Sequence, residues 1–509
     1  MSNQIQILAP KQGVSQSAMV GFADIRNIDI HSVQGITLCN NIMSKVSATT
    51  IVGQIKWLVR HPITSAEIYA LDDGGKVYRS GDSGATWALM TGFTAGGHGN
   101  GLAIFKNYLI VARDAYLDIC GDGAASGNGT TTGIANANWS NSWKAIDSDV
   151  LWHPMITSKN DSKLYGGAGR FVFSLDENTG QTFAPGTAGT FTYTQQALDL
   201  PVNYRIKCIE ELGNNLMLGT WQGTAVTDIR IADLFPWDRS SVSFGQPVVI
   251  DDFGIHALKN DGNSLIVLAG ISGTIRRCDG SNAYIVGQIP NSVCNLTGTK
   301  YLEFYPGSIM TYKNKTFFGI GENELGVDGI GIWSLLQTGK GNIMTLEHQI
   351  SNFGVTANTG VTQIIKVSAL LAVTKSSFLA GWRDNTTYGL DLTGTSYAYA
   401  TDYSASFTTP LYIVGTNLNQ RKITELEWSL SKPLRTGEGI KIEYRTNLTM
   451  DFVEVETWAY ADVNVGAIVS KNLITELPND IKTCELIQLR ISLKGTATTS
   501  PEFRSLILK

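Results

Sequence analysis

The chain reads Glu67-Ile-Tyr-Ala-Leu71, then Asp72-Asp-Gly-Gly75, then Lys76-Val-Tyr-Arg79, and this pattern returns along most of its length. Two apolar runs joined by a turn rich in Asp and Gly predict an antiparallel β-hairpin. Similar phrases follow along the chain, and their glycine-rich parts, such as Gly166–Gly169, are assigned to turns. The later copies are Asn107–Ala112, Ser162–Phe173, Asn215–Val226, Ser264–Gly270, Lys315–Gly319 and Ala369–Val373.

The spacing of these phrases predicts the architecture. The copies recur about every 50 residues, the length that a four-stranded antiparallel sheet needs with its turns. One such sheet cannot bury both of its faces, whereas copies stacked radially can, as in a β-propeller. Residues 51–400 are therefore predicted to form a β-propeller of about seven blades. Six or eight blades stay open because the second copy carries a long insertion, Gly121–Asn138.

The two ends of the chain fall outside this repeat. Residues 1–50 form either a strand that closes the last blade or an arm that docks on a neighbouring subunit. Residues 401–509 alternate apolar and polar positions, as in Ile440–Tyr444 and Ile487–Leu493. Such alternation is typical of an antiparallel sheet with one buried face, and the length suits one jelly-roll-like β-sandwich. The predicted fold is all-β, a propeller followed by a C-terminal antiparallel sandwich.

The composition excludes several classes of function. Charged residues make up 16% of the 509, and the net charge is −5, so no basic field is available to hold nucleic acid. No apolar run approaches the roughly 20 residues of a membrane helix, and the polar residues 1–7 do not resemble a secretory signal. The six cysteines form no Cys-x-x-Cys pair, which predicts buried free thiols, although Cys278 and Cys294 could face each other across a hairpin.

One local pattern is sharp. The octapeptide Ser80-Gly-Asp-Ser-Gly-Ala-Thr-Trp87 resembles the Asp-box of sialidase-like propellers, and Ser174–Phe183 resembles a degenerate copy. We expect a structural role: Asp82 accepts hydrogen bonds within its own turn, and Gly84 adopts positive φ. Thr86 begins the returning strand and Trp87 packs into the blade. The structural Asp-box residues are Ser80, Asp82, Gly84, Thr86 and Trp87.

No catalytic, cofactor or metal site is expected. The sialidase resemblance would imply three arginines around a carboxylate and a Tyr–Glu pair, and Tyr301 with Glu303 is a candidate for that pair. However, Tyr204-Arg-Ile-Lys207 lacks the proline of the family's arginine setting. The six histidines show no metal-binding spacing.

Packing roles are expected for the tryptophans in or beside turns. The candidate arginines are Arg113, Arg170, Arg205 and Arg383, and those tryptophans are Trp139, Trp143, Trp152, Trp221, Trp237, Trp333 and Trp382.

The texture of the chain resembles structural proteins of tailed-bacteriophage particles. The resemblance lies in Gly21–Ser32 and in the closing segments Tyr444–Asn447, Leu486–Leu493 and Ser500–Leu508. It implies a non-enzymatic virion component of the tail or its host-facing attachments, made in the host cytoplasm and acting in assembly and host attachment. Its expected partners are other tail proteins and further copies of itself, with neither nucleic acid nor membrane insertion. The alternatives are a propeller that binds host surface glycan for receptor recognition and a sialidase-like glycoside hydrolase.

Overall fold

The computed structural model contains strands and no helix in the part of the chain that it describes, which confirms the all-β prediction. It follows that none of these residues lies in a helix able to span a membrane. The described residues are 5–8, 24–26, 28–29, 36–39, 43–46, 51–63, 65–90, 97–106, 108–120, 139–147, 152–177, 191–223, 231–289, 301–322, 330–338, 341–352, 364–393, 403, 405–409, 411–413, 426–447, 449–459, 486–496 and 498–508.

The chain divides into two compact units. The propeller unit spans Ser44–Gly331 and Ile350–Thr393, and the sandwich unit spans Met1–Met43, Ile332–Gln349 and Gly394–Lys509. The expected boundaries at residues 50 and 400 therefore miss one feature, because residues 332–349 belong with the sandwich.

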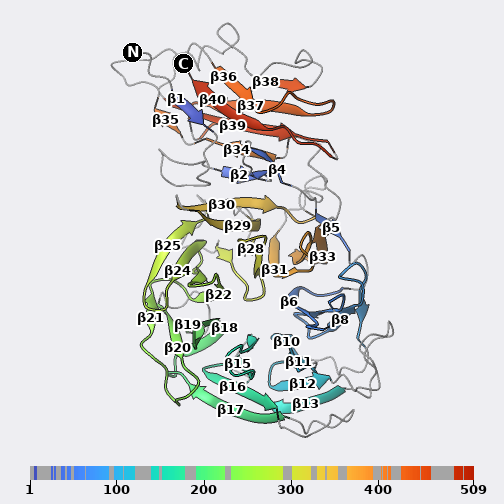
Figure 1. Ribbon diagram of the computed structural model, residues 1–509, viewed down its shortest axis with the longest axis vertical. Helices are drawn as coiled ribbons and strands as arrows, with labels where there is room; N and C mark the ends of the chain where they lie inside the picture. The colour runs from blue at the N-terminus through green and yellow to red at the C-terminus, as the bar shows by residue number, and fades with distance from the viewer. Residues whose placement is uncertain are drawn as a thin grey trace. The chain divides into compact units, whose positions relative to one another are not determined.

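Five four-stranded antiparallel sheets follow one another in the propeller unit, and each is a simple meander (Figure 1). Their regular order reproduces the period of the sequence. The first is β6 (Ile55–Arg60), β7 (Ile68–Asp72), β8 (Val77–Ser80) and β9 (Ala88–Leu89); the second is β10 (Gly101–Phe105), β11 (Tyr108–Ala112), β12 (Tyr116–Cys120) and β13 (Trp139–Ala145). The third is β14 (Met155–Thr157), β15 (Leu164–Ala168), β16 (Phe171–Glu177) and β17 (Phe191–Asp199); the fourth is β18 (Tyr204–Leu212), β19 (Asn215–Gln222), β20 (Ala232–Trp237) and β21 (Val248–Ile250); the fifth is β22 (Ile255–Asn260), β23 (Leu265–Ala269), β24 (Thr274–Cys278) and β25 (Ala283–Gln288).

Two further sheets complete the unit. Both continue the antiparallel pattern among the residues that the structure describes. The sixth contains β26 (Leu302–Glu303), β27 (Ile309–Tyr312) and β28 (Lys315–Glu322); the seventh contains β31 (Ile365–Ala372), β32 (Phe378–Asp384), β33 (Thr387–Thr393) and β5 (Met43–Lys45).

The sheets form a closed ring. The strands β6, β10, β14, β18, β22, β27 and β31 contact one another in that order, and β31 contacts β6. Figure 1 shows the sheets arranged around this circle. Each sheet is thus a blade whose faces are covered by its neighbours, and the unit is a β-propeller. The seventh blade takes its last strand from the N-terminal side, because β5 lies beside β33 and the Val46 amide donates to the Leu390 carbonyl at 2.9 Å.

Glycines within strands let neighbouring blades approach closely. Gly166 and Gly167 lie inside β15, so the prediction that Gly166–Gly169 is a turn was wrong for these two residues. A Cβ on Gly167 would lie 2.7 Å from Cγ2 of Ile206 in the next blade. Second strands of other blades repeat this contact between a glycine and a β-branched residue. The further pairs are Gly219 with Ile255, Gly319 with Val367 and Gly381 with Ile55.

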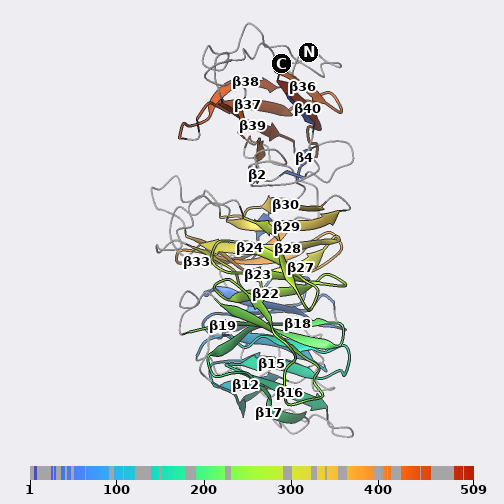
Figure 2. The same ribbon diagram turned by 90° about the vertical axis from the view of Figure 1, so that its left-hand side faces the viewer.

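The sandwich unit is built from both ends of the chain. One sheet has the order β1-β40-β36, and the other includes β38-β37-β39-β34-β2-β30-β29. The parallel pair of β2 with β30 explains why residues 332–349 belong here. Figure 2 shows β37 between β38 and β39. The strands of the unit are β1 (Ile5–Leu8), β2 (Asp24–Arg26), β3 (Ile28–Asp29), β4 (Thr37–Leu38), β29 (Gly331–Thr338), β30 (Gly341–His348), β34 (Ala405–Thr408), β35 (Tyr412–Ile413), β36 (Leu426–Leu430), β37 (Gly439–Arg445), β38 (Val453–Ala459), β39 (Leu486–Lys494) and β40 (Phe503–Leu508).

Large side chains fill the space between these two sheets. Trp428 on β36 and Trp458 on β38 are 1% and 3% exposed, with ring centroids 5.1 Å apart. Phe407 and Phe503 meet edge to face at 5.3 Å in the same core. Because one hydrophobic core joins both sheets, the unit is a β-sandwich.

Candidate functional site

The turn between β8 and β9 is held by its own side chains. Oδ1 of Asp82 accepts hydrogen bonds from the Ser80 hydroxyl and the Thr86 amide, both at 2.8 Å, and Oδ2 accepts from the Thr86 hydroxyl at 2.6 Å. Gly84 has φ +88° and its amide donates to Oγ of Ser80 at 2.8 Å. The buried Trp87 ring donates from Nε1 to the Gly84 carbonyl at 3.0 Å. All five residues singled out in the sequence therefore meet in one turn.

These contacts also set the ionisation of Asp82. Partial burial alone would raise the pKa of its carboxyl, but the hydrogen bonds from Thr86 and Ser80 outweigh it and hold the pKa below its usual range. The carboxylate is thus ionised at neutral pH and accepts its hydrogen bonds from residues of the same turn. Such a group stabilises a hairpin and is not available to a substrate.

The candidate arginines lie in four different blades. Arg113 follows β11 and makes a buried ion pair with Asp118, in which Nη2 donates to Oδ1 at 2.8 Å. Arg170, between β15 and β16, pairs with Asp199 at 3.1 Å. The Arg113 and Arg170 guanidinium groups are therefore each occupied by a carboxylate of their own blade.

The other two arginines are occupied as well. Arg205 on β18 stacks over the Trp221 ring at 5.7 Å, and Arg383 on β32 donates from Nε to the Asn385 carbonyl at 2.6 Å. Glu303 accepts hydrogen bonds from the Tyr305 hydroxyl and, at 2.8 Å, from Lys366. The described structure does not bring these arginines together around one carboxylate site.

The expected packing role of the tryptophans is confirmed for six of the seven. These six are 8% exposed or less, while Trp143 is half-buried and packs against Phe191 at 6.1 Å. Their aromatic surface is used within the fold. The six are Trp139, Trp152, Trp221, Trp237, Trp333 and Trp382.

The sequence did not predict a cluster of two lysines and a histidine on the first strands of the blades, named here the Lys207 cluster. Lys56, Lys207 and His256 lie at register shifts of β6, β18 and β22, where a β-bulge re-aims a side chain. Nζ of Lys207 donates to Nδ1 of His256 at 2.8 Å and lies 5.2 Å from the Trp152 ring centroid. Nζ of Lys56 lies 4.7 Å from the same centroid.

Burial controls the charges of this cluster. It lowers the pKa of Lys207 to about 8, and burial followed by the charge of Lys207 moves the pKa of His256 well below its usual value. A neutral imidazole thus accepts a hydrogen bond from a lysine ammonium, and this contact ties the fourth blade to the fifth. The common signal was in the sequence, since Lys56, Lys207 and His256 each follow an isoleucine.

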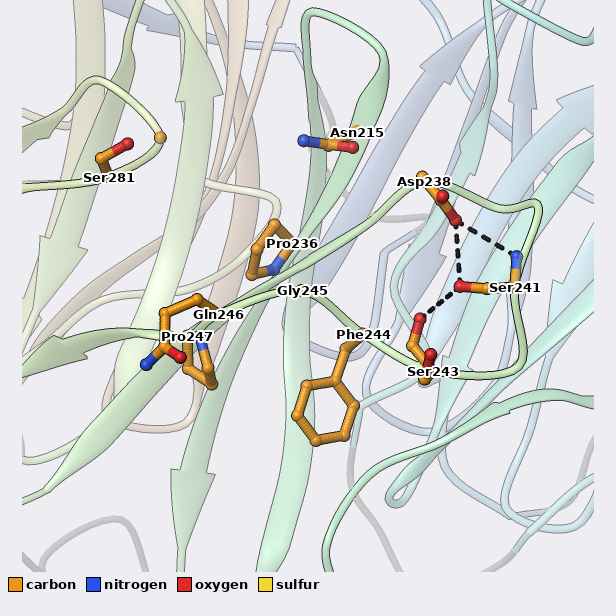
Figure 3. Close-up of a pocket in the computed structure, with 11 residues that line it drawn as sticks. Asn215, Pro236, Asp238, Ser241, Ser243, Phe244, Gly245, Gln246, Pro247 and Ser281 are labelled. Atoms are coloured by element: carbon orange, nitrogen blue, oxygen red, sulfur yellow. Dashed lines mark hydrogen bonds between the residues drawn. The ribbon is translucent and has the colours of Figure 1, made fainter.

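A surface groove of about 450 Å³ lies at the outer part of the fourth and fifth blades (Figure 3). Residues 238–247, between β20 and β21, supply most of its lining, and Pro236 in β20, Asn215 at the start of β19 and the turn before β25 supply the rest. No pattern in the sequence marked it, because the two segments meet only when adjacent blades are stacked. Its lining consists of Asn215, Pro236, Asp238, Ser241, Ser243, Phe244, Gly245, Gln246, Pro247, Gly280 and Ser281.

Neither a disulfide nor a group of metal-binding side chains is found among the described residues. Cys39, Cys120, Cys208 and Cys278 form no disulfide, whereas Cys294, the partner considered for Cys278, lies outside the described residues. No group of three or more His, Cys, Asp or Glu in the described part of the chain is placed to hold a metal ion.

The chain contains a β-propeller and a β-sandwich. The solved structures that it resembles include β-propeller domains. No protein-family model and no curated protein matches the chain. The RRP9 WD40 repeats align with TM-score 0.43 and 11% identity over 70% of this chain and 98% of theirs. The β-propeller domain of Cps50 (Swd1) from Myceliophteria thermophila gives 0.42 and 11% over 69% and 99%, and the Neurospora crassa Pan2 WD40 domain gives 0.41 and 6% over 70% and 97%.

Proposed function

We propose that the protein is a non-enzymatic structural component of a tailed-phage particle, located in the tail or its host-facing attachments. The observation that carries this proposal is the use of ionisable side chains between the protein's own blades. Besides the Lys207–His256 contact, Lys259 on β22 pairs with Glu210 on β18 at 2.9 Å. Groups that an enzyme would gather at an open site here join the fourth blade to the fifth.

The phage origin is supported by the resemblance of residues 21–32, 444–447, 486–493 and 500–508 to proteins of tailed-phage particles. The Asp-box-like turn at residues 80–87 fits the same proposal. Its polar side chains form hydrogen bonds with one another and with backbone amides of the turn, which is a structural role. Synthesis in the host cytoplasm agrees with the reduced thiols of Cys208 and Cys278.

Outer strands of the propeller offer a surface for assembly. Val249 on β21 is 66% exposed, and Tyr284 and Ile285 on β25 are 52% and 59% exposed. The two strands contact each other, so these apolar side chains belong to neighbouring edges. Exposed apolar groups with few charges are typical of protein interfaces, and we propose that a further copy or another tail protein covers this surface.

The test is incorporation into particles. In cells infected by the parent phage, the protein is expected to co-sediment with purified particles, and Ile285→Glu should reduce its incorporation severalfold. Ile63→Glu on the first blade is the matched control, since Ile63 is 72% exposed and lies elsewhere. Both variants should retain the wild-type unfolding midpoint. A protein that stays in the soluble fraction, or that releases sugar from host polysaccharide at enzymatic rates, overturns the proposal.

A further inference from the structure

The groove between the fourth and fifth blades has unused hydrogen-bonding capacity. The side chains of Asn215, Ser243, Gln246 and Ser281 line it and make no hydrogen bond with other described residues. Two carboxamides and two hydroxyls thus present both donors and acceptors to one volume. Polar lining of this kind fits a ligand that itself donates and accepts at several neighbouring positions.

The charge of the groove selects against anions. Asp238 is the one charged side chain among the eleven residues that line it. Its carboxylate accepts hydrogen bonds from Ser240 and Ser241, at 2.8–3.2 Å, and those from Ser240 contribute most to lowering its pKa. An ionised, hydrogen-bonded carboxylate repels phosphate and carboxylate ligands. The charge of the lining therefore disfavours an anionic ligand.

The walls of the groove are stiff and partly apolar. Phe244 is half-buried, and its ring meets Phe235 edge to face at 4.8 Å, which fixes it while part of the ring lines the groove. Pro236 and Pro247 add rigid apolar surface, and the Gly245 amide donates to the Pro236 carbonyl at 2.7 Å. Figure 3 shows Phe244 and the two prolines on the same side of Asn215.

We infer that this groove binds a neutral saccharide. Sugar hydroxyls both donate and accept, which matches Asn215, Gln246 and the serines, and a C–H face of a sugar ring packs against Phe244. The volume lies within the range of small-ligand sites. The inference goes beyond the proposed assembly role, because it concerns ligand binding by other residues of the same two blades and stands whether or not the chain belongs to a particle.

The experiment uses the purified full chain and saturation-transfer NMR with lactose, maltose, cellobiose and chitobiose, and sialyllactose as the acidic counterpart of lactose. We expect millimolar binding of at least one neutral disaccharide and weaker binding of sialyllactose than of lactose. Gln246→Ala should weaken the neutral sugar about tenfold, the value of roughly one hydrogen bond. Gln196→Ala, on the exposed outer strand β17, is the matched control and should change nothing.

A second variant separates binding from folding. Phe244→Leu keeps an apolar side chain against Phe235 but removes the ring face, so it should weaken the sugar while the unfolding midpoint is preserved. The inference is overturned if none of the four neutral sugars binds at millimolar concentration, if sialyllactose binds as well as lactose, or if binding survives both Gln246→Ala and Phe244→Leu. None of these results changes the expected incorporation into particles, so the two proposals fail separately.

Discussion

The interfaces between propeller blades and the interior of the sandwich solve the same packing problem in opposite ways. Between blades, a strand glycine such as Gly219 brings the backbone close to a β-branched side chain such as Ile255. In the sandwich, the sheets are held apart by large rings such as Trp428 and Trp458. The first interface has no room for an added atom, and the second depends on the volume of the rings that fill it.

The largest expected effect is in the sandwich. Trp428→Ala should lower the free energy of unfolding by about 3–5 kcal/mol, because it removes a fully buried ring and leaves a cavity beside Trp458. Hydrogen exchange of strands β36–β40 is the measurement. Trp428→Phe is the control. Nε1 of Trp428 has no hydrogen-bond partner among the described residues, so this substitution removes part of the ring volume and no hydrogen bond. A cost below about 1 kcal/mol for the alanine variant would remove the contrast.

The reverse change tests the propeller. Gly219→Ala places a Cβ 2.4 Å from Sγ of Cys208 and 2.7 Å from Cγ2 of Ile255, so it should destabilise the chain by about 1–3 kcal/mol. Gly81→Ala is the control, because nothing lies within 4 Å of its Cβ and its φ is not positive; it should be neutral or slightly stabilising. Urea unfolding followed by fluorescence gives both values. Equal effects at the two glycines would contradict close blade packing.

A smaller effect is expected in the turn at residues 80–87, which is held by hydrogen bonds and not by either kind of packing. Asp82→Ala should cost about 1 kcal/mol near neutral pH, since it removes the hydrogen bonds of Thr86 and Ser80 at a surface site. The folded pKa of Asp82 lies below its unfolded value of about 3.9, so its contribution is present above that pH and is lost as the pH falls through the folded pKa. Unfolding of both proteins at neutral and strongly acidic pH should therefore show the difference shrinking in acid.

The smallest effect is expected on the blade surface. Lys163 and Asp176 form an ion pair at 2.9 Å, but their side chains are 38% and 46% exposed. Asp176→Asn should change the free energy of unfolding by less than about 0.5 kcal/mol, and added salt should reduce even that. A larger loss in urea titrations would mean that the outer strands contribute more to the blade than packing alone predicts.

The sequence predicted the repeat well and its contacts poorly. The period near 50 residues and the alternation in Ile440–Tyr444 came from local patterns that each sheet needs, so the propeller and the sandwich could be anticipated. A glycine signals a turn and a close contact equally, and only the neighbouring blade distinguishes them, as at Gly167 and Ile206.

The candidate sites show the same limit. The residues at 80–87 lie together because they are neighbours in the chain, so their turn could be predicted. The Lys207–His256 contact and the groove join segments of different blades, and their distances depend on how the blades stack. For the Lys207 cluster, a repeated isoleucine before the cation was a usable signal, whereas residues 236–247 offered none.

The hydrogen bond from Val46 to Leu390 has a consequence for synthesis. Both partners must exist before the ring can close, yet the ribosome makes them far apart in time. At typical elongation rates the growing chain waits roughly 20–70 s between the two residues. During that interval the strand β5 lacks its partner β33, and the side of the first blade that β31 later covers at β6 is exposed. Unpaired strand edges can associate with other nascent chains. The yield of native protein is therefore expected to depend on how closely ribosomes follow one another on the message, more than on the stability of the finished ring.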